Sequence, residues 1–231
     1  MKKIKVLGDK IIEKLISSFR SGKADSAIPQ SYDCKKFLNW QEINCPPLYF
    51  YKNWDAKKLP TENGASFLFH DGENITMMSV MEDSDVYSDA QPINDRTWEK
   101  GDILEFFIRP PEQERYYELH VAPNLASLQI SIPKCEDLLA KKYKLADLFF
   151  DMDAELGAGI ISTENFKGWW GLISVPAKNI NIDLNKTHSA TFTVCRYNYW
   201  RKVETPECSS SAPLTQNRFH SPHQWQTLIF K

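Results

Sequence analysis

The stretch Ile103-Leu104-Glu105-Phe106-Phe107-Ile108-Arg109 and the stretch Tyr116-Tyr117-Glu118-Leu119-His120-Val121 decide the fold class. The first is an almost continuous run of apolar and β-branched or aromatic residues, which is typical of a buried strand. The second alternates, as side chains do along a strand. One face carries Tyr117, Leu119 and Val121, and the other carries Tyr116, Glu118 and His120. Pro123-Asn124 then turns the chain into a third strand over residues 127–132, and such short separations favour antiparallel pairing.

Other short strands separated by turn signals extend this pattern in both directions. Asp71-Gly72 marks the turn of a hairpin between a strand at 67–69 and one at 75–80. Later strands are predicted at 169–175, 190–200 and 225–230, with a polar loop over 205–217. Many short strands with helices only at the margins predict an all-β fold, namely an antiparallel β-sandwich of jelly-roll type.

Two helices are expected beside the strands. The first lies between residues 10 and 19, where an apolar stripe ends at Ser21-Gly22; the stripe consists of Ile11, Ile12, Leu15, Ile16 and Phe19. Residues 136–150 are predicted as a minor later helix, with a tightly packed loop as the alternative. The region 31–60 is rich in Pro, Asn and aromatic residues and indicates coil with short strands, in which Trp40 and Trp54 pack. We therefore divide the chain into an N-terminal helix and lead-in segment packed on the domain (1–60) and a β-sandwich domain (61–231).

Composition excludes several classes of protein. A net charge of −2 over 231 residues is not the basic excess of a protein that binds nucleic acid by electrostatics, so no nucleic-acid partner is expected. No stretch reaches the ~18 apolar residues that a membrane span requires. Five scattered cysteines without a C-x-x-C pair argue against a zinc ribbon and mildly favour a reducing compartment. The oligomeric state stays open.

The N-terminus leaves the compartment undecided. Met1-Lys2-Lys3 resembles the beginning of a signal peptide, but charged residues interrupt any apolar segment that would follow; these are Asp9, Lys10, Glu13 and Lys14. We therefore expect no secretory signal at this end of the sequence.

Two carboxylates stand out because each lies in an otherwise apolar strand. Burying the side chains of Glu105 and Glu118 is costly unless they are paired or hydrogen-bonded. One explanation is a salt bridge to Arg109, Arg115 or Arg196. A second is ligand binding. A third is glycoside hydrolysis, which needs two carboxylates about 5–9 Å apart across a sugar, but nothing in the sequence distinguishes an acid from a base.

Metal-binding patterns are incomplete. Asp151, Asp153 and Glu155 alternate like the opening of a calcium loop, yet Leu156 and Ser162 occupy the positions where an EF-hand requires Gly and Glu. An EF-hand is therefore rejected, and calcium bound by a sandwich-type site remains an alternative. A second acidic pair, Asp83 and Asp85, is interpreted as a solvated turn, again with calcium as the alternative.

Two histidines form another incomplete pattern. His220 and His223 flank Ser221-Pro222, a spacing loosely like part of a metal site, but no acidic or cysteine partner is near in sequence. No cofactor is assigned from these patterns.

Aromatic residues provide a second signal. Sugar rings stack their C–H faces on aromatic rings while their hydroxyls bond to polar side chains. Trp98 is the best candidate, because it follows the polar loop 92–96 and precedes the strand that carries Glu105. Together these residues predict a small pocket that is both polar and aromatic.

Four segments resemble a known family. The run 98–107, Trp-Glu-Lys-Gly-Asp-Ile-Leu-Glu-Phe-Phe, resembles the W-x-x-D-x-V-E-I-F motif of family 9 carbohydrate-binding modules and their DOMON-like relatives. The run 116–124 is similar to their Y-Y-E-F-x-x-N-P segment, and 169–176 to their W-x-x-E-x-x-I-P strand. The end of the chain, 219–230, resembles the F-H-R-P…F-G-x-L-x-F terminus of one subgroup. The resemblance covers roughly residues 64–231.

The resemblance implies a β-sandwich that binds a terminal sugar between two aromatic rings without cleaving it, and calcium occurs in several members. By position, Trp98 matches the first ring, Glu105 a hydroxyl acceptor, and His120 an arginine that donates to the sugar. The loop 205–218, which should supply the second ring, contains no Trp. Trp200, Phe219 and Trp225 lie nearby and stay open as alternatives.

Non-catalytic carbohydrate binding is therefore the leading hypothesis, with Trp98, Glu105 and His120 forming one wall of the site. Arg196 is an added candidate that either pairs with Glu105 or donates to a hydroxyl. The alternative is a structural or partner-binding sandwich, which the missing loop Trp favours. The resemblance implies a third class, haem binding, because some DOMON-like relatives carry haem with Met and His ligands. Met77, Met78 and Met81 lie in one strand region here, with His70, His120 or His188 as partners, but methionines in strands are commonly core residues.

Overall fold

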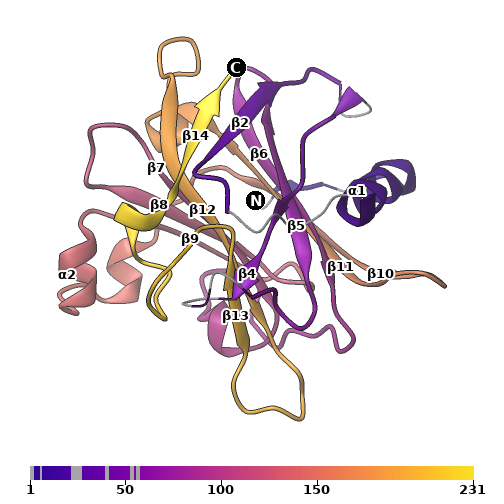
Figure 1. Cartoon of the computed structure of the whole chain (residues 1–231). Helices are drawn as coiled ribbons and strands as arrows, with labels where there is room; N and C mark the ends of the chain where they lie inside the picture. Colours follow the sequence, from indigo (N-terminus) through magenta and orange to yellow (C-terminus); the bar gives the residue numbers. More distant parts are fainter. Residues whose placement is uncertain (1–2, 6, 22–27, 40–41, 53–54, 56–57) are drawn as a thin grey trace.

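The strands of the chain pair into one continuous sheet, which curls so that its two halves pack face to face (Figure 1). The computed structural model describes residues 3–5, 7–21, 28–39, 42–52, 55 and 58–231. Trp40 and Trp54, which the sequence predicts to pack, lie outside the described residues. The all-β sandwich is confirmed.

The elements are short, as the turn-rich sequence predicts. The strands are β1 (Lys3–Ile4), β2 (Ser31–Lys36), β3 (Leu48–Tyr49), β4 (Tyr51–Lys52), β5 (Gly64–His70), β6 (Asn74–Glu82), β7 (Ile103–Arg109), β8 (Tyr116–Val121), β9 (Ser127–Ile132), β10 (Glu155–Ser162), β11 (Lys167–Pro176), β12 (Ser189–Asn198), β13 (Glu207–Ser210) and β14 (Gln226–Phe230). The helices are α1 (Asp9–Ser21) and α2 (Cys135–Leu139), with 3-10 turns η2 (Thr97–Glu99), η3 (Leu145–Leu148), η4 (Ala177–Ile180) and η5 (Pro222–Gln224).

Strand β2 connects the two halves of the sheet. The first half runs β1-β10-β11-β6-β5 and the second runs β14-β12-β7-β8-β9. Residues 31–34 of β2 pair with β14, and residues 35–36 pair with β5. Pairing is antiparallel as predicted, except at β1–β10, β14–β2 and β2–β5, which are parallel. The segment 1–60 therefore contributes strands to the sandwich itself.

The main hydrophobic core lies between the two halves. It contains the side chains of β7 and β8 that point inward, and among them are Leu104, Phe106, Tyr117, Leu119 and Val121. Because side chains alternate along a strand, the intervening residues of β7 and β8 must point away from this core. A second cluster forms on that outer face, where the α2–η3 region (residues 135–148) and the C-terminal loop between β13 and β14 (residues 211–225) cover the sheet. It includes Phe107, Tyr116, Phe219 and Trp225.

Helix α1 forms as its apolar stripe predicts. Leu15 and Phe19 are buried in the main core, and the hydroxyl of Tyr49 donates to the carbonyl oxygen of Phe19 at 2.7 Å. The helix lies on the opposite side of the molecule from α2 (Figure 1). No helix among the described residues is both long and apolar enough to cross a membrane.

Three local predictions differ from the structure. Strand β10 was not predicted, because its glycines break the strand pattern; a Cβ on Gly159 would lie 2.5 Å from the indole nitrogen of Trp170. Strand β13 lies inside the loop that the Ser-rich sequence predicted over 205–217. The later helix is two short turns, α2 and η3, because Lys141 adopts a positive φ of 56° and ends the first.

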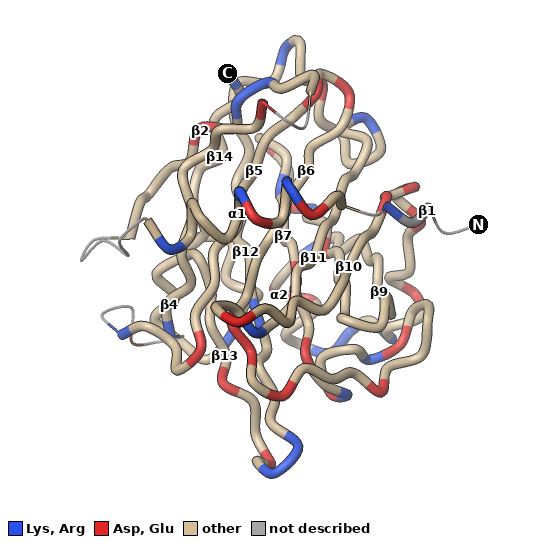
Figure 2. Tube along the Cα trace, turned by 90° about the vertical axis from the view of Figure 1, so that its right-hand side faces the viewer, with Lys and Arg blue, Asp and Glu red and all other residues tan. Residues whose placement is uncertain are grey.

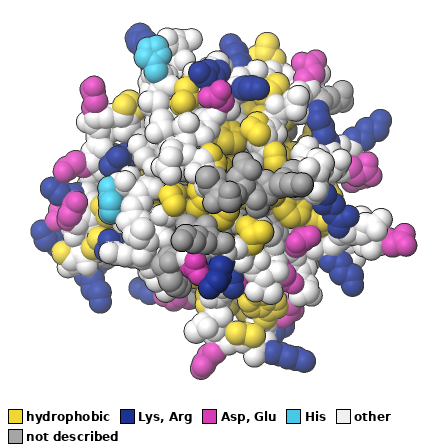
Figure 3. All heavy atoms as spheres, viewed as in Figure 1, with side chains coloured by type: hydrophobic (Ala, Val, Ile, Leu, Met, Phe, Trp, Pro, Cys, Tyr) yellow, Lys and Arg dark blue, Asp and Glu magenta, His cyan; other side chains and the backbone are white. Residues whose placement is uncertain are grey.

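Charged side chains are spread over the surface. Figure 2 shows Lys and Arg interspersed with Asp and Glu, mostly at loops and strand ends, while the middle of the strands is largely uncharged. The face in Figure 3 carries both signs around its outline, with hydrophobic side chains nearer its centre. The face in Figure 3 thus carries no large area of a single sign.

Candidate functional site

The outer face of β7 and β8 carries a row of polar side chains. Glu105 on β7 lies directly opposite His120 on β8, and Glu118 is two residues before His120 on the same face. The alternation of β8, with Tyr116, Glu118 and His120 on one face, is therefore confirmed by the two hydrophobic clusters.

These three side chains form a buried cluster. The Nε2 atom of His120 lies 2.6 Å from an oxygen of Glu118 and 3.3 Å from an oxygen of Glu105. Glu105 is 3% exposed, Glu118 is 4% exposed, and His120 is fully buried. Within the described part of the chain, this is the one set of three or more His, Cys, Asp or Glu side chains whose ligand atoms all lie within 4.8 Å of one another.

A fourth group reaches the cluster from the C-terminal loop. The Nε2 atom of His220 lies 3.8 Å from the second carboxylate oxygen of Glu118. Both imidazoles are held at their other nitrogen, Nδ1: His120 by the hydroxyl of Thr97 at 2.7 Å, and His220 by the hydroxyl of Tyr116 at 2.7 Å. Each ring therefore directs Nε2 toward the carboxylates.

Burial and charge set the protonation of the cluster. Burial raises the pKa of Glu105 to about 8, although His120 acts in the opposite direction. Burial also acts to raise the pKa of Glu118, but His220 and His120 together outweigh it and bring the pKa below its ordinary value. Burial acts to lower the pKa of His120, and the two glutamates raise it overall. Glu118 and His120 thus form the charged pair, with Glu105 the more readily protonated carboxyl.

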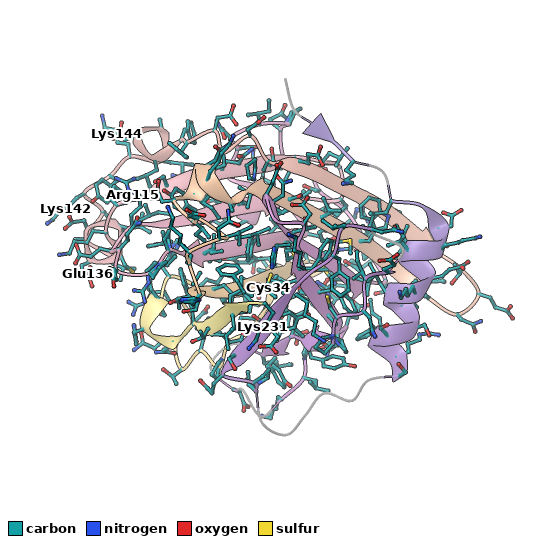
Figure 4. All side chains as sticks on the ribbon, turned by 90° about the horizontal axis from the view of Figure 1, so that it is seen from above. Cys34, Arg115, Glu136, Lys142, Lys144 and Lys231 are labelled. Atoms are coloured by element: carbon teal, nitrogen blue, oxygen red, sulfur yellow. The ribbon has the colours of Figure 1, made fainter. Side chains whose placement is uncertain are left out.

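The cluster lies at a pocket of about 500 Å³ on this outer face. Glu105, Glu118 and His220 line it directly. Its aromatic lining is Trp98, Tyr143, Tyr197 and Phe219, and its charged rim is Arg96, Lys141 and Arg218. The α2–η3 region bounds the pocket at the end of the molecule opposite α1, where Figure 4 labels Glu136, Lys142 and Lys144. A cavity with apolar walls and a few converging polar groups is the usual form of a small-ligand site.

Trp98 is held in position by the turn η2. Gly101 lies at a φ of 128°, and a Cβ there would lie 2.5 Å from the carbonyl oxygen of Tyr87, so the turn requires glycine. The hydroxyl of Tyr199 donates to the carbonyl oxygen of Trp98 at 2.6 Å. The indole meets the His120 ring edge-on at 5.9 Å, so the half-buried tryptophan lies beside the polar cluster.

Arg196 lies elsewhere, and the expected pairing with Glu105 is wrong. In the register of β12 with β7, Cys195 lies opposite Glu105, so the Arg196 side chain points to the other face of the sheet. There it is 1% exposed and lies 3.3 Å from Asp83. It also donates to the carbonyl oxygens of Glu62 and Glu82, each at 2.8 Å. The guanidinium thus joins the two halves of the sandwich and takes no part in the pocket.

The acidic residues that the sequence offers as calcium ligands pair with other groups. Asp151 accepts a hydrogen bond from the backbone N–H of Asp153, while Glu155 pairs with Lys5 at 3.5 Å. Asp83 pairs with Arg196 and is buried, contrary to its interpretation as part of a solvated turn. Of the two histidines that resemble part of a metal site, His223 contacts Gln224. His220 has an acidic partner, Glu118, which lies on β8 and is distant in sequence.

The three candidates for a second aromatic ring differ in where they lie relative to the pocket. Phe219 lines the pocket. Trp225 packs behind it against Phe107 and Tyr116, and its indole N–H donates to the carbonyl oxygen of Phe219 at 2.9 Å. Trp200 does not line this pocket.

Comparison with solved structures identifies the class of fold. The structure is similar to a protein from Bacteroides uniformis ATCC 8492 named for carbohydrate binding, with a TM-score of 0.61 and 18% identity over 87% of this chain and 99% of the other. It is also similar to a family 9 carbohydrate-binding module from Caldicellulosiruptor kristjanssonii. The complex with cellotriose gives a TM-score of 0.58 and 8% identity, covering 87% of this chain and 93% of the module. The complex with glucose gives 0.56 and 9%, covering 87% and 95%.

The chain therefore has the fold of the family 9 carbohydrate-binding modules, as the motifs of the sequence predict. No protein-family model matches the sequence, and no curated protein matches it. At these identities the likeness concerns the fold, and the function has to be argued from the site.

The sequence identified part of this site. Trp98 and Glu105 line the pocket as the motifs predict, and so does Glu118, for which ligand binding is one of three explanations. His120 contacts both glutamates but is fully buried and is not among the residues that line the pocket, contrary to its expected place in the wall of the site. Glu118 had a signal, since it shares a strand face with His120. His220 had only its spacing from His223, and Tyr143 had no signal, because loops far apart in the sequence bring them to the pocket.

Proposed function

We propose that the chain binds a saccharide, without cleaving it, in the pocket on the outer face of β7 and β8. The observation that carries the proposal is the meeting of aromatic side chains with buried carboxylates in one pocket of about 500 Å³. A sugar presents apolar C–H faces and a rim of hydroxyls, so it needs both kinds of partner. Glu105 and Glu118 supply acceptors, and Trp98 supplies a ring face.

Charged donors complete the lining. Arg96, Lys141 and Arg218 lie at the rim, and Asn217 adds an amide. Arg96 is tied to Glu99 at 2.9 Å, and the Nε atom of Arg218 donates to the hydroxyl of Ser221 at 3.4 Å. These groups can donate to sugar oxygens at the edge of the pocket while Trp98 holds the ring. The structural neighbours named for cellotriose and glucose complexes support the same class of ligand.

The carboxylate geometry favours binding over hydrolysis. A glycosidase places the scissile bond between two carboxyl groups about 5–9 Å apart. Here Glu105 and Glu118 both contact the same nitrogen of His120, and their ligand atoms lie within 4.8 Å. The imidazole of His120 contacts both carboxylates, which suits the pair to accepting hydrogen bonds on one side of a ligand.

Replacing Trp98 by Ala is expected to weaken saccharide binding by about tenfold or more, because the contribution of one stacked ring is on the order of 1 kcal/mol beyond the area it buries. The affinity of Trp98→Phe, which keeps a smaller ring, should lie between those of the wild type and Trp98→Ala. Calorimetric titration with cellotriose, glucose and a panel of other mono- and oligosaccharides, with and without calcium, measures this directly.

The matched control is Trp200→Ala, which removes a partly buried tryptophan that does not line the pocket. Its affinity should equal that of the wild type. Equal losses in Trp98→Ala and Trp200→Ala would show that the pocket is not the binding site.

A partner-binding role is the alternative function, and one observation favours it. Leu139, Phe149 and Phe150, in or near the α2–η3 region, are 38–42% exposed. If no saccharide in the panel binds the wild-type chain, this apolar surface becomes the leading candidate for a contact with another protein.

A further inference from the structure

The most unusual feature of the pocket is a set of four ligand-type side chains that meet at its base. Glu105, Glu118 and His120 come from adjacent strands, and His220 comes from the C-terminal loop. We propose that these four side chains bind a divalent transition-metal ion, and that Zn²⁺ is the ion which their donor set fits best.

The spacing of the donor atoms suits such an ion. Zinc is bound by His nitrogen and Glu oxygen at about 2.0–2.2 Å, almost always with tetrahedral geometry, so neighbouring ligand atoms lie about 3.3–3.6 Å apart. The Nε2 atom of His120 lies 3.3 Å from Oε1 of Glu105 and 2.6 Å from Oε1 of Glu118, and the Nε2 atom of His220 lies 3.8 Å from the other oxygen of Glu118, Oε2. Glu105, Glu118 and His120 already offer ligand atoms within 4.8 Å of one another, and the imidazole of His220 would have to move closer to that set to become the fourth ligand.

The imidazoles are held as metal ligands usually are. A ligating histidine almost always bonds through its second ring nitrogen to a group that fixes the orientation and tautomer of the ring. The Nδ1 atom of His120 bonds to the hydroxyl of Thr97, and that of His220 bonds to the hydroxyl of Tyr116. In both residues, Nε2 is therefore the atom that faces the carboxylates.

One atom of the cluster has an unmet requirement. The second carboxylate oxygen of Glu118, Oε2, is buried and has no hydrogen-bond partner. The residue as a whole is 4% exposed. Leaving a buried carboxylate oxygen unpaired costs on the order of 1–3 kcal/mol or more. This oxygen faces His220, so a cation placed between Glu118 and His220 would satisfy it. Two carboxylates and two neutral imidazoles would balance the charge of a divalent ion.

The donor types select among ions. Calcium and magnesium prefer oxygen ligands, six or more of them for calcium, whereas imidazole suits zinc, copper, iron and nickel. Half of the present donors are imidazole nitrogens. The ion can reach the cluster from solvent, because Glu105, Glu118 and His220 line the open pocket. This inference does not depend on saccharide binding.

The test is a calorimetric titration of chelator-treated, metal-free protein with ZnCl₂ in the absence of any sugar. We expect saturable binding of one Zn²⁺ per chain. Glu118→Gln and His220→Asn should each weaken it by at least about 100-fold, which exceeds the 10–100-fold loss typical for groups that only support a ligand. Substitution with Co²⁺ should give the absorption spectrum of a four-coordinate site with nitrogen and oxygen ligands.

His223→Asn is the matched control, because this histidine is three residues from His220 but contacts Gln224, whereas His220 faces Glu118. It should bind Zn²⁺ as the wild type does. The proposal is overturned if the wild type gives no saturable heat, or if the His220→Asn and Glu118→Gln variants bind Zn²⁺ as tightly as wild type. If the Glu118→Gln variant fails to fold, His220→Asn still decides, because His220 is a partly exposed loop residue. Saccharide binding that persists without Zn²⁺ binding would overturn this inference alone.

Discussion

Replacing Arg196 by Leu is expected to lower the free energy of unfolding by about 3–5 kcal/mol, the range typical when one partner of a buried ion pair is removed. The guanidinium is 1% exposed and lies 3.3 Å from Asp83. Its loss would leave Asp83 and the carbonyl oxygens of Glu62 and Glu82 without this donor inside the sandwich. Burial and the nearby carboxylate of Asp83 raise the pKa of Asp102 to about 8. Urea denaturation measures the change.

Arg201→Leu provides the control for Arg196→Leu. Arg201 forms an ion pair with Asp85 at the surface, and its side chain is 57% exposed. Exposed pairs contribute about 0–1 kcal/mol, so this variant should unfold almost as the wild type does. A double variant, Arg196→Leu with Asp83→Asn, should recover part of the lost stability because one buried charge is removed. Similar losses for Arg196→Leu and Arg201→Leu would contradict the buried role of Arg196.

Replacing Trp225 by Ala should reduce stability by about 3–5 kcal/mol, as expected for a large aromatic side chain in a core. Trp225 is 7% exposed and contacts Phe107 and Tyr116 at ring-centre distances of 5.4 and 5.2 Å. Its indole also holds the carbonyl oxygen of Phe219 at 2.9 Å, and Phe219 and His220 both line the pocket. The variant should therefore lose ligand binding together with stability.

Trp225→Phe separates these two effects. It keeps an aromatic ring against Phe107 and Tyr116 but removes the hydrogen bond to Phe219. The free energy of unfolding should therefore fall by only about 1–2 kcal/mol, roughly one hydrogen bond plus some packing. Chemical denaturation and saccharide titration of the two variants check both expectations. If Trp225→Ala were as stable as Trp225→Phe, the expected contribution of ring packing against Phe107 and Tyr116 would be wrong.

The strands could be predicted where hydrophobic patterning is strong. Those at 103–109, 116–121 and 127–132 have the same bounds in the sequence analysis and in the structure, because their continuous or alternating apolar residues serve a buried sheet. Strand β10 was missed because its glycines make room for the ring of Trp170 from the neighbouring strand, and that requirement is visible only after folding.

The candidate site was predictable to the extent that it lies on two adjacent strands. Glu105 and His120 are placed by the pairing of β7 with β8, and Trp98 by the turn before β7. The register of β12 could not be predicted, and a shift of one residue moves a side chain to the opposite face. This is why pairing with Glu105, one of the two roles expected of Arg196, is wrong. The contact of His220 with Glu118 joins a distant loop to β8, and no local pattern predicts it.

The most direct test of a saccharide site at the cluster is an NMR titration that follows the indole N–H signals of the seven tryptophans. Addition of cellotriose, glucose or another sugar from the panel should shift the Trp98 signal in a saturable way and leave that of Trp200 unchanged. Assignment with Trp98→Phe identifies the signal. A saturable shift of other tryptophans without Trp98, or no saturable shift with any sugar, would contradict the account.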